Sequence, residues 1–132
     1  MLKKRLGIEA IEKGWPNSNK WLSDYFKIPS PLIIPDSVEK IGDFAFSYCN
    51  NLKEVVIPDG VERIGYKAFE GCKELEKVIV PKSVKFIGDC AFNRCEKATI
   101  ILQKPRRKFK FIGNCAFYRC ESVDYAEEET GN

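Results

Sequence analysis

Apolar residues return along this chain at a fixed period of 23 residues. Three successive segments, which start at Pro35, Pro58 and Pro81, share the pattern P-x-x-V-x-x-I-G-x-x-A-F-x-x-C. A fourth copy, lengthened by two residues, reads F-x-F-I-G-x-C-A-F-x-x-C from Phe109 to Cys120. A fixed period with the same residue types in the same slots is the signature of a solenoid, in which each unit buries its apolar face against the next. The pattern therefore predicts about four stacked rungs of similar shape.

The aligned slots of the rungs predict how the core is built. Members of one slot, stacked at the strand spacing of about 4.8 Å, form a continuous ladder through the solenoid. A glycine follows the isoleucine slot in every copy, which indicates either a positive φ or a close approach of the backbone at a corner of the coil. A short helical turn is expected at A-F-x-x-C, because residues three apart share one helix face. The ladders are Val38, Val61 and Val84; Ile41, Ile64, Ile87 and Ile112; Phe46, Phe69, Phe92 and Phe117; and Gly42, Gly65, Gly88 and Gly113.

Segments rich in Val, Ile and Leu predict one strand in each rung, near 31–34, 53–57, 76–80 and 99–103. In the strand motif L-x-x-V-x-I, the first, fourth and sixth residues point inward, and the fifth points outward because strand side chains alternate. An aliphatic stripe on a sheet face indicates an interface. The alternative is that β-propensity alone selects these residues. The predicted outward column is Ile33, Val56, Ile79 and Leu102, and the neighbouring outward column becomes apolar at Ile100.

Residues 1–28 do not carry the repeat. Apolar residues at helical spacing predict a short amphipathic helix near 2–13, which Gly14 ends and Pro16 prevents from continuing. A second short helix is expected over 19–27. The predicted domain organisation is an N-terminal helical cap (1–28) that covers the first rung, a solenoid (29–125) and an acidic disordered tail (126–132). A separate binding helix at the N-terminus is the alternative.

The combined pattern L-x-x-V-x-I-P-x-x-V-x-x-I-G-x-x-A-F-x-x-C, repeated over about residues 29–125, closely resembles the BspA-type leucine-rich repeats, also called the Treponema pallidum type. The resemblance implies an α/β repeat fold, a right-handed leucine-rich-repeat solenoid with a short parallel β-sheet on one side. It also implies a role in protein binding, since such repeats in bacteria and protists mostly belong to adhesins or surface recognition proteins.

Six cysteines and the lack of any histidine limit the chemistry that this chain can perform. Cys90 and Cys115 stand in one slot of adjacent rungs, within disulfide reach, and are expected as thiols in a reducing cytosol. A zinc site built from Cys90-x4-Cys95 and Cys115-x4-Cys120 is the alternative. Without histidine, a phosphate-binding glycine loop or a calcium loop, the sequence predicts no enzyme, no cofactor and no metal. The other four cysteines recur in one ladder slot, which indicates buried free thiols: Cys49, Cys72, Cys95 and Cys120.

A basic insertion interrupts the repeat at residues 104–111, where five cations lie within seven positions. Aromatic residues stand among these cations, and such interleaving is typical of single-stranded nucleic-acid binding. The alternative is a solvated basic turn, which the acidic segment from Glu121 to Glu129 can cover. A second candidate surface is expected where Phe86 and Phe111 replace the cations of the earlier copies. The candidate contacts of the basic insertion are Arg106, Arg107, Lys108 and Lys110.

These patterns predict a non-enzymatic protein–protein interaction module that binds its partner through the sheet face of the solenoid. The net charge of +3 is too small to imply a nucleic-acid partner by itself. The chain has no apolar stretch near 18 residues and no evident signal peptide, so no membrane span and a cytoplasmic location are expected.

The size and location narrow this expectation to a small intracellular effector or inhibitor. A phage- or mobile-element-encoded inhibitor of a host nuclease, of the anti-CRISPR sort, fits the short chain and its basic turn. The alternatives are nucleic-acid binding through 104–111 and a fragment of a bacterial surface adhesin. A homodimer is also expected, through the sheet face or through an open C-terminal rung.

Overall fold

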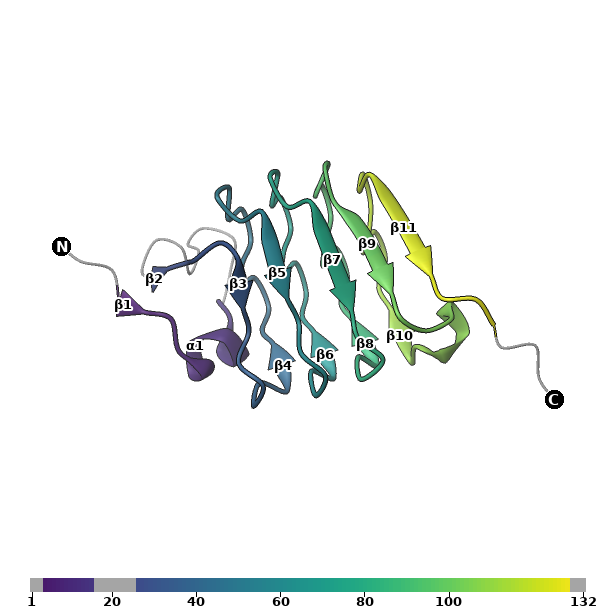
Figure 1. Cartoon of the computed structure of the whole chain (residues 1–132), viewed down its shortest axis with the longest axis horizontal. Coiled ribbons are helices and arrows are strands. Elements are labelled where there is room, and N and C mark those ends of the chain that lie inside the picture. Colours follow the sequence, from purple (N-terminus) through teal and green to yellow (C-terminus); the bar gives the residue numbers. More distant parts are fainter. Residues whose placement is uncertain (1–3, 16–25, 129–132) are drawn as a thin grey trace.

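The chain folds into a parallel β-solenoid whose rungs each place short strands in two stacks (Figure 1). The computed structural model describes residues 4–15 and 26–128. Each strand pairs in parallel with the strand one rung away, about 23 residues along the chain. The larger sheet holds β3 (Leu32–Ile33), β5 (Glu54–Val56), β7 (Lys77–Val80), β9 (Thr99–Leu102) and β11 (Ser122–Tyr125), and the smaller sheet holds β4 (Lys40–Ile41), β6 (Arg63–Ile64), β8 (Phe86–Ile87) and β10 (Phe111–Ile112).

The predicted solenoid of about four rungs is confirmed, with its strands close to the predicted ranges. Its helical content is small: within the described residues, the helices are α1 (Ile8–Lys13) and a 3₁₀ turn, η1 (Arg106–Lys108). The smaller sheet was not predicted. Its strands are two residues long, so they show no alternation of apolar and polar residues from which a strand could be recognised.

The N-terminal region departs from the predicted pair of helices. Helix α1 begins at Ile8 instead of residue 2, and Gly14 ends it with a φ of 66°. Preceding it, β1 (Lys4–Arg5) pairs in parallel with β2 (Phe26–Lys27), so the prediction of helix at both of these segments is wrong. Pairing between segments far apart in sequence overrides helical spacing here. The rest of the predicted second helix lies outside the described residues.

The predicted ladders form the core. The rings of Phe46, Phe69 and Phe92 stack with centroids 5.3 and 5.1 Å apart, and Phe117 continues the stack at 6.0 Å. The first three are fully buried, as are the valine and isoleucine ladders of the same rungs. Since a fully buried side chain of this size contributes about 1.5–3 kcal/mol, stacking the rungs supplies the stability that one rung lacks.

The corner glycines are required because the backbone of the preceding rung lies close to them. This is one of the two reasons that the sequence predicted. A Cβ on Gly65 would lie 2.7 Å from the backbone nitrogen of Asp43, and one on Gly88 would lie 2.6 Å from that of Tyr66. Left-handed φ angles fall instead on the second residue after each glycine, such as Lys67 at 54°. This residue interrupts any helix, so the expected helical turn is a series of single hydrogen-bonded turns.

Candidate protein-interaction surface

A column of aliphatic side chains runs across the outer face of the larger sheet. Register places Ile33 beside Val56, Val56 beside Ile79, and Ile79 beside Ile101. Their exposed fractions are 66% for Ile33, 44% for Val56 and 41% for Ile79, while Ile101 is half-buried. The predicted outward position of the first three residues is therefore confirmed. On β11 the column ends with the exposed Asp124.

The predicted outward position of Leu102 and Ile100 is wrong. Both are buried, and they pair with the inward-pointing Val80 and Val78. The reason is a one-residue deletion: Val78 lies six positions after Cys72, whereas Ile100 lies five positions after Cys95. A shift of one residue moves every side chain of a strand to the opposite face.

The fourth member of the column is Ile101, which the sequence interpretation missed. The one-residue deletion can be seen in the sequence after Cys95. Ala98 occupies the position of Leu75, but one residue separates Ala98 from Ile100, whereas two residues separate Leu75 from Val78. Aligning the strands by their buried residues instead of by a constant period would have identified Ile101.

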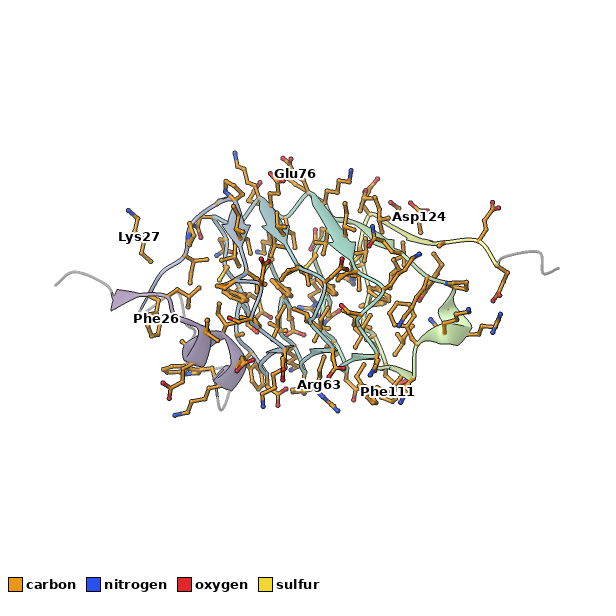
Figure 2. The ribbon with its side chains drawn as sticks, turned by 60° about the horizontal axis from the view of Figure 1, so that its bottom comes forward. Phe26, Lys27, Arg63, Glu76, Phe111 and Asp124 are labelled. Atoms are coloured by element: carbon orange, nitrogen blue, oxygen red, sulfur yellow. The ribbon has the colours of Figure 1, made fainter. Side chains whose placement is uncertain are left out.

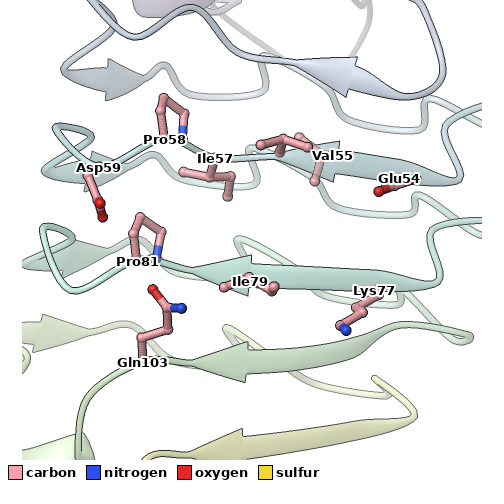
Figure 3. Close-up of a pocket in the computed structure, with 10 residues that line it drawn as sticks. Glu54, Val55, Ile57, Pro58, Asp59, Lys77, Ile79, Pro81 and Gln103 are labelled. Carbon is pink, nitrogen blue, oxygen red and sulfur yellow. The ribbon is translucent and has the colours of Figure 1, made fainter.

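Charged side chains border the aliphatic column on both sides. Glu54 and Lys77 are register partners at one side, and Asp59 and Lys82 lie at the turns on the other side. All four are exposed. Between them lies a shallow depression of about 400 Å³, with Val56, Ile79 and two prolines in its lining (Figure 3). Small ligands bind in enclosed sites, whereas this depression is lined by exposed side chains. It is therefore better suited to binding the surface of another protein.

The two phenylalanines predicted as a second surface lie on the smaller sheet, in the column that begins with Lys40 and Arg63. Phe111 is 50% exposed, and Arg63 and Phe111 both lie at the outer rim of the molecule (Figure 2). Phe86 is half-buried because the guanidinium of Arg63 lies 4.3 Å from its ring centroid. Phe111 is thus the more accessible of the two.

The basic insertion forms η1 and contacts the C-terminal segment. The Arg106 guanidinium donates a hydrogen bond of 2.8 Å to the Tyr125 hydroxyl, and Arg107 donates one of 2.7 Å to the Glu128 carboxylate. The acidic segment therefore covers part of the turn, as the alternative interpretation expected. Lys108 and Lys110 are exposed.

The aromatic residues of this insertion do not stand beside its exposed cations on one face. Phe109 is buried, with the Lys104 ammonium 4.5 Å from its ring centroid, and Phe111 belongs to the smaller sheet. Burial lowers the pKa of Lys104, and the nearby Lys85 lowers it further. The predicted combination of basic and stacking side chains is therefore not assembled on one surface, although Arg106, Arg107 and Lys108 share η1 and Lys110 follows it closely in the chain.

The ladder cysteines are buried as predicted except Cys120, which is half-buried. Cys49, Cys72 and Cys95 are buried, and the thiols of Cys72, Cys95 and Cys120 donate to backbone carbonyls of earlier rungs. Burial raises the pKa of Cys72 well above its ordinary value and that of Cys120 to about 12, so these thiols stay protonated and unreactive.

The two remaining cysteines are free thiols at left-handed positions, Cys90 half-buried and Cys115 exposed. Burial raises the pKa of Cys90, and the Glu70 carboxylate acts in the same direction. In the part of the chain that the structure describes, no group of three or more potential metal ligands comes together, so the alternative zinc site has no ligand set there. Nor is any described helix long and apolar enough to cross a membrane.

Comparison with known proteins agrees with the repeat pattern. A family model described as "BspA type Leucine rich repeat region (6 copies)" matches residues 24–128. No curated protein matches the chain. Among solved structures, a leucine rich cell surface protein from Faecalibacterium prausnitzii A2-165 is similar at 23% sequence identity and a TM-score of 0.46. That match covers 80% of this chain and 34% of the other, so this chain spans about a third of that protein.

Proposed function

This chain belongs to the BspA-type leucine-rich repeat family, and from that premise we propose that it is a protein-binding module whose docking surface is the outer face of the larger sheet. Repeats of this family generally serve as non-enzymatic binding modules. The docking surface is defined here as the aliphatic column Ile33, Val56, Ile79 and Ile101 together with its charged borders, Lys53, Glu54, Asp59, Glu76, Lys77 and Lys82.

The observation that carries this proposal is the exposure of neighbouring aliphatic side chains on a face that has no covering element among the described residues. Ile33, Val56 and Ile79 stand next to one another on adjacent strands and leave 41–66% of their surface to solvent. Covering an apolar row with a partner is favourable by about 25 cal/mol for each Å² removed from water. Apolar patches bordered by polar residues mark protein interfaces.

The borders define the chemistry of the partner. Its surface carries aliphatic side chains that meet the column. It also carries cations that meet Glu54 and Asp59, and carboxylates that meet Lys77 and Lys82. Such alternating borders fix the orientation of the partner more than they add affinity.

Three narrower functions remain predictions: an inhibitor of a host nuclease, a fragment of a surface adhesin, and a nucleic-acid binder. The first two would use the same docking surface. The third would use the exposed cations of the basic insertion, Arg106, Arg107, Lys108 and Lys110, although Arg106 and Arg107 also contact the C-terminal segment.

Site-specific photo-crosslinking tests the docking surface. A photoreactive phenylalanine analogue replaces Ile79 in one variant and Tyr66 in a control, two positions with exposed fractions of 41% and 40%. In cells that express the full chain, the variant at position 79 should form an adduct with a protein identified by mass spectrometry, and the control should not. A Val56→Asp substitution should remove that adduct. Equal adducts at both positions, or none at position 79, would contradict the proposal.

A further inference from the structure

The charged borders of the docking surface have a regular order along the solenoid. Three pairs of exposed residues, one rung apart, carry opposite charges: Lys53 with Glu76, Glu54 with Lys77, and Asp59 with Lys82. The first member of each pair belongs to the rung of β5 and the second to the rung of β7. Each pair of positions forms one border row, and the sign of the charge in every border row therefore reverses between these two rungs.

These charges do not pair with one another, although Lys53 also attracts the Glu74 carboxylate and Glu76 attracts the Lys97 ammonium. In the described part of the chain, none of the three pairs forms an ion pair within 4.0 Å. Away from this face, pairs with the same spacing do form: Lys85 lies 3.0 Å from Glu62, and Lys97 lies 2.8 Å from Glu74. Figure 3 shows Glu54 and Lys77 on neighbouring strands, at the edge of the depression.

We propose that the partner of the docking surface is a second copy of this chain, related by a two-fold axis that runs parallel to the strands between β5 and β7. A half-turn about this axis reverses the order of the rungs and preserves the position along each strand. It places β5 against β7 of the second copy, and β3 against its β9. This inference rests on the proposed function and names the occupant of its surface.

Every border row is complementary to itself under that half-turn. Glu54 meets Lys77 of the second copy, Asp59 meets Lys82, and Lys53 meets Glu76. Each contact occurs twice, because an isologous interface uses the same patch on both subunits. The aliphatic column also meets itself, since Val56 faces Ile79 and Ile33 faces Ile101. The chemistry required of the partner is therefore the chemistry that the chain itself carries.

The face is small for a dimer interface. The four rungs of this face lie about 4.8 Å apart, and the face spans about six residues of each rung at about 3.3 Å, strand and adjoining turn together, which makes a patch of roughly 19 by 20 Å. This is about half of the 800 Å² per partner that a standard stable interface buries. The dimer is accordingly weak, with half-association expected at roughly 10⁻⁵–10⁻⁴ M.

Charge-reversal variants of the full chain test the arrangement. In Glu54→Lys, two lysines face each other across the axis, and in Lys77→Glu, two glutamates do so. Sedimentation velocity of each variant alone should show dimerisation weakened about tenfold or more, since like charges in contact oppose association. Mixing the two variants should restore it, because in the heterodimer each contact between positions 54 and 77 again joins one lysine to one glutamate.

Matched controls separate this surface from general charge effects. Glu62→Lys and Lys85→Glu reverse a pair with the same spacing off the docking surface and should leave association unchanged, and circular dichroism should report the native fold for all four variants. A wild-type chain that stays monomeric at roughly 10⁻⁴ M, single variants that dimerise like the wild type, or a mixture that stays monomeric would each overturn the inference.

Failure of this inference is distinguishable from failure of the proposed function. A monomeric wild type that still gives a Val56-dependent adduct at position 79 with a different protein overturns the self-association and retains the docking surface. A monomeric wild type without any adduct at position 79 overturns both.

Discussion

At the scale of single residues, Phe69 shows how the aromatic ladder joins neighbouring rungs. It is fully buried and stacks between Phe46 and Phe92 at 5.3 and 5.1 Å. Replacing Phe69 by alanine leaves a cavity between two rungs and should lower the free energy of unfolding by about 3–5 kcal/mol. Urea denaturation followed by circular dichroism measures this change.

The matched control for Phe69 is Tyr118, whose side chain is 51% exposed. Tyr118→Ala should change the free energy of unfolding by no more than about 0.5 kcal/mol. Equal effects of the two substitutions would show that the aromatic ladder does not determine stability.

The Cys120 thiol makes stability depend on alkaline pH. Burial raises its pKa from 9.0 to about 12 in the folded chain. A group whose pKa is raised on folding contributes stability that is intact below the unfolded pKa and is lost as pH rises toward the folded one. The free energy of unfolding should therefore fall between about pH 9 and 12, and fall less in Cys120→Ala.

Denaturant titrations at several alkaline pH values test this linkage. The exposed Cys115 provides the control, since Cys115→Ala should retain the pH dependence of the wild type. Identical slopes for the wild type and Cys120→Ala would contradict the assignment.

At the scale of elements, the orientation of β9 decides which residues reach the docking surface. Leu102 is 1% exposed, whereas Ile101 is half-buried in the outward column. An aspartate at position 102 would be a charge without a partner in the core and should lower the free energy of unfolding by more than about 4 kcal/mol. Ile101→Asp should cost about 1 kcal/mol or less.

Thermal unfolding of Leu102→Asp and Ile101→Asp compares the two positions directly. If Ile101→Asp unfolds the chain while Leu102→Asp leaves it stable, the register of β9 against β7 is wrong.

The repeat made most of the fold predictable from sequence. Ladders such as Ile41, Ile64 and Ile87 were identified because one slot is occupied by the same residue in every rung, and all three are buried as expected. The prediction was wrong where the period changes by one residue, at Ile100, and where tertiary pairing replaces a helix, at Lys27. The charge order of the docking surface follows from the 23-residue spacing of β5 and β7 and was not recognised, because it links positions in different rungs instead of positions within one repeat.

At the scale of the whole molecule, each rung of the solenoid contacts and stabilises only its neighbours. The protection of backbone amides from hydrogen exchange should therefore depend on the position of a rung along the solenoid. The middle rungs have a paired strand on both sides, as β7 has in β5 and β9. Within the described chain, β11 pairs on one side with β9. Burial follows the same gradient, since Phe92 is fully buried and Phe117 of the last copy is half-buried.

Amide hydrogen exchange should therefore be slower in β7 than in β11. Opening β11 exposes one interface between rungs, whereas opening β7 breaks two, and local opening free energies rise toward the global value in the core. We expect the amides of residues 78–80 to exchange at least about tenfold more slowly than those of 123–125. Mass-spectrometric exchange on the full chain measures both segments at once.

Docking on the sheet face leaves the hydrogen bonds between strands intact, so this difference in exchange rate should persist in dimer and monomer alike. Equal protection of β7 and β11 would mean that the rungs open as one cooperative unit.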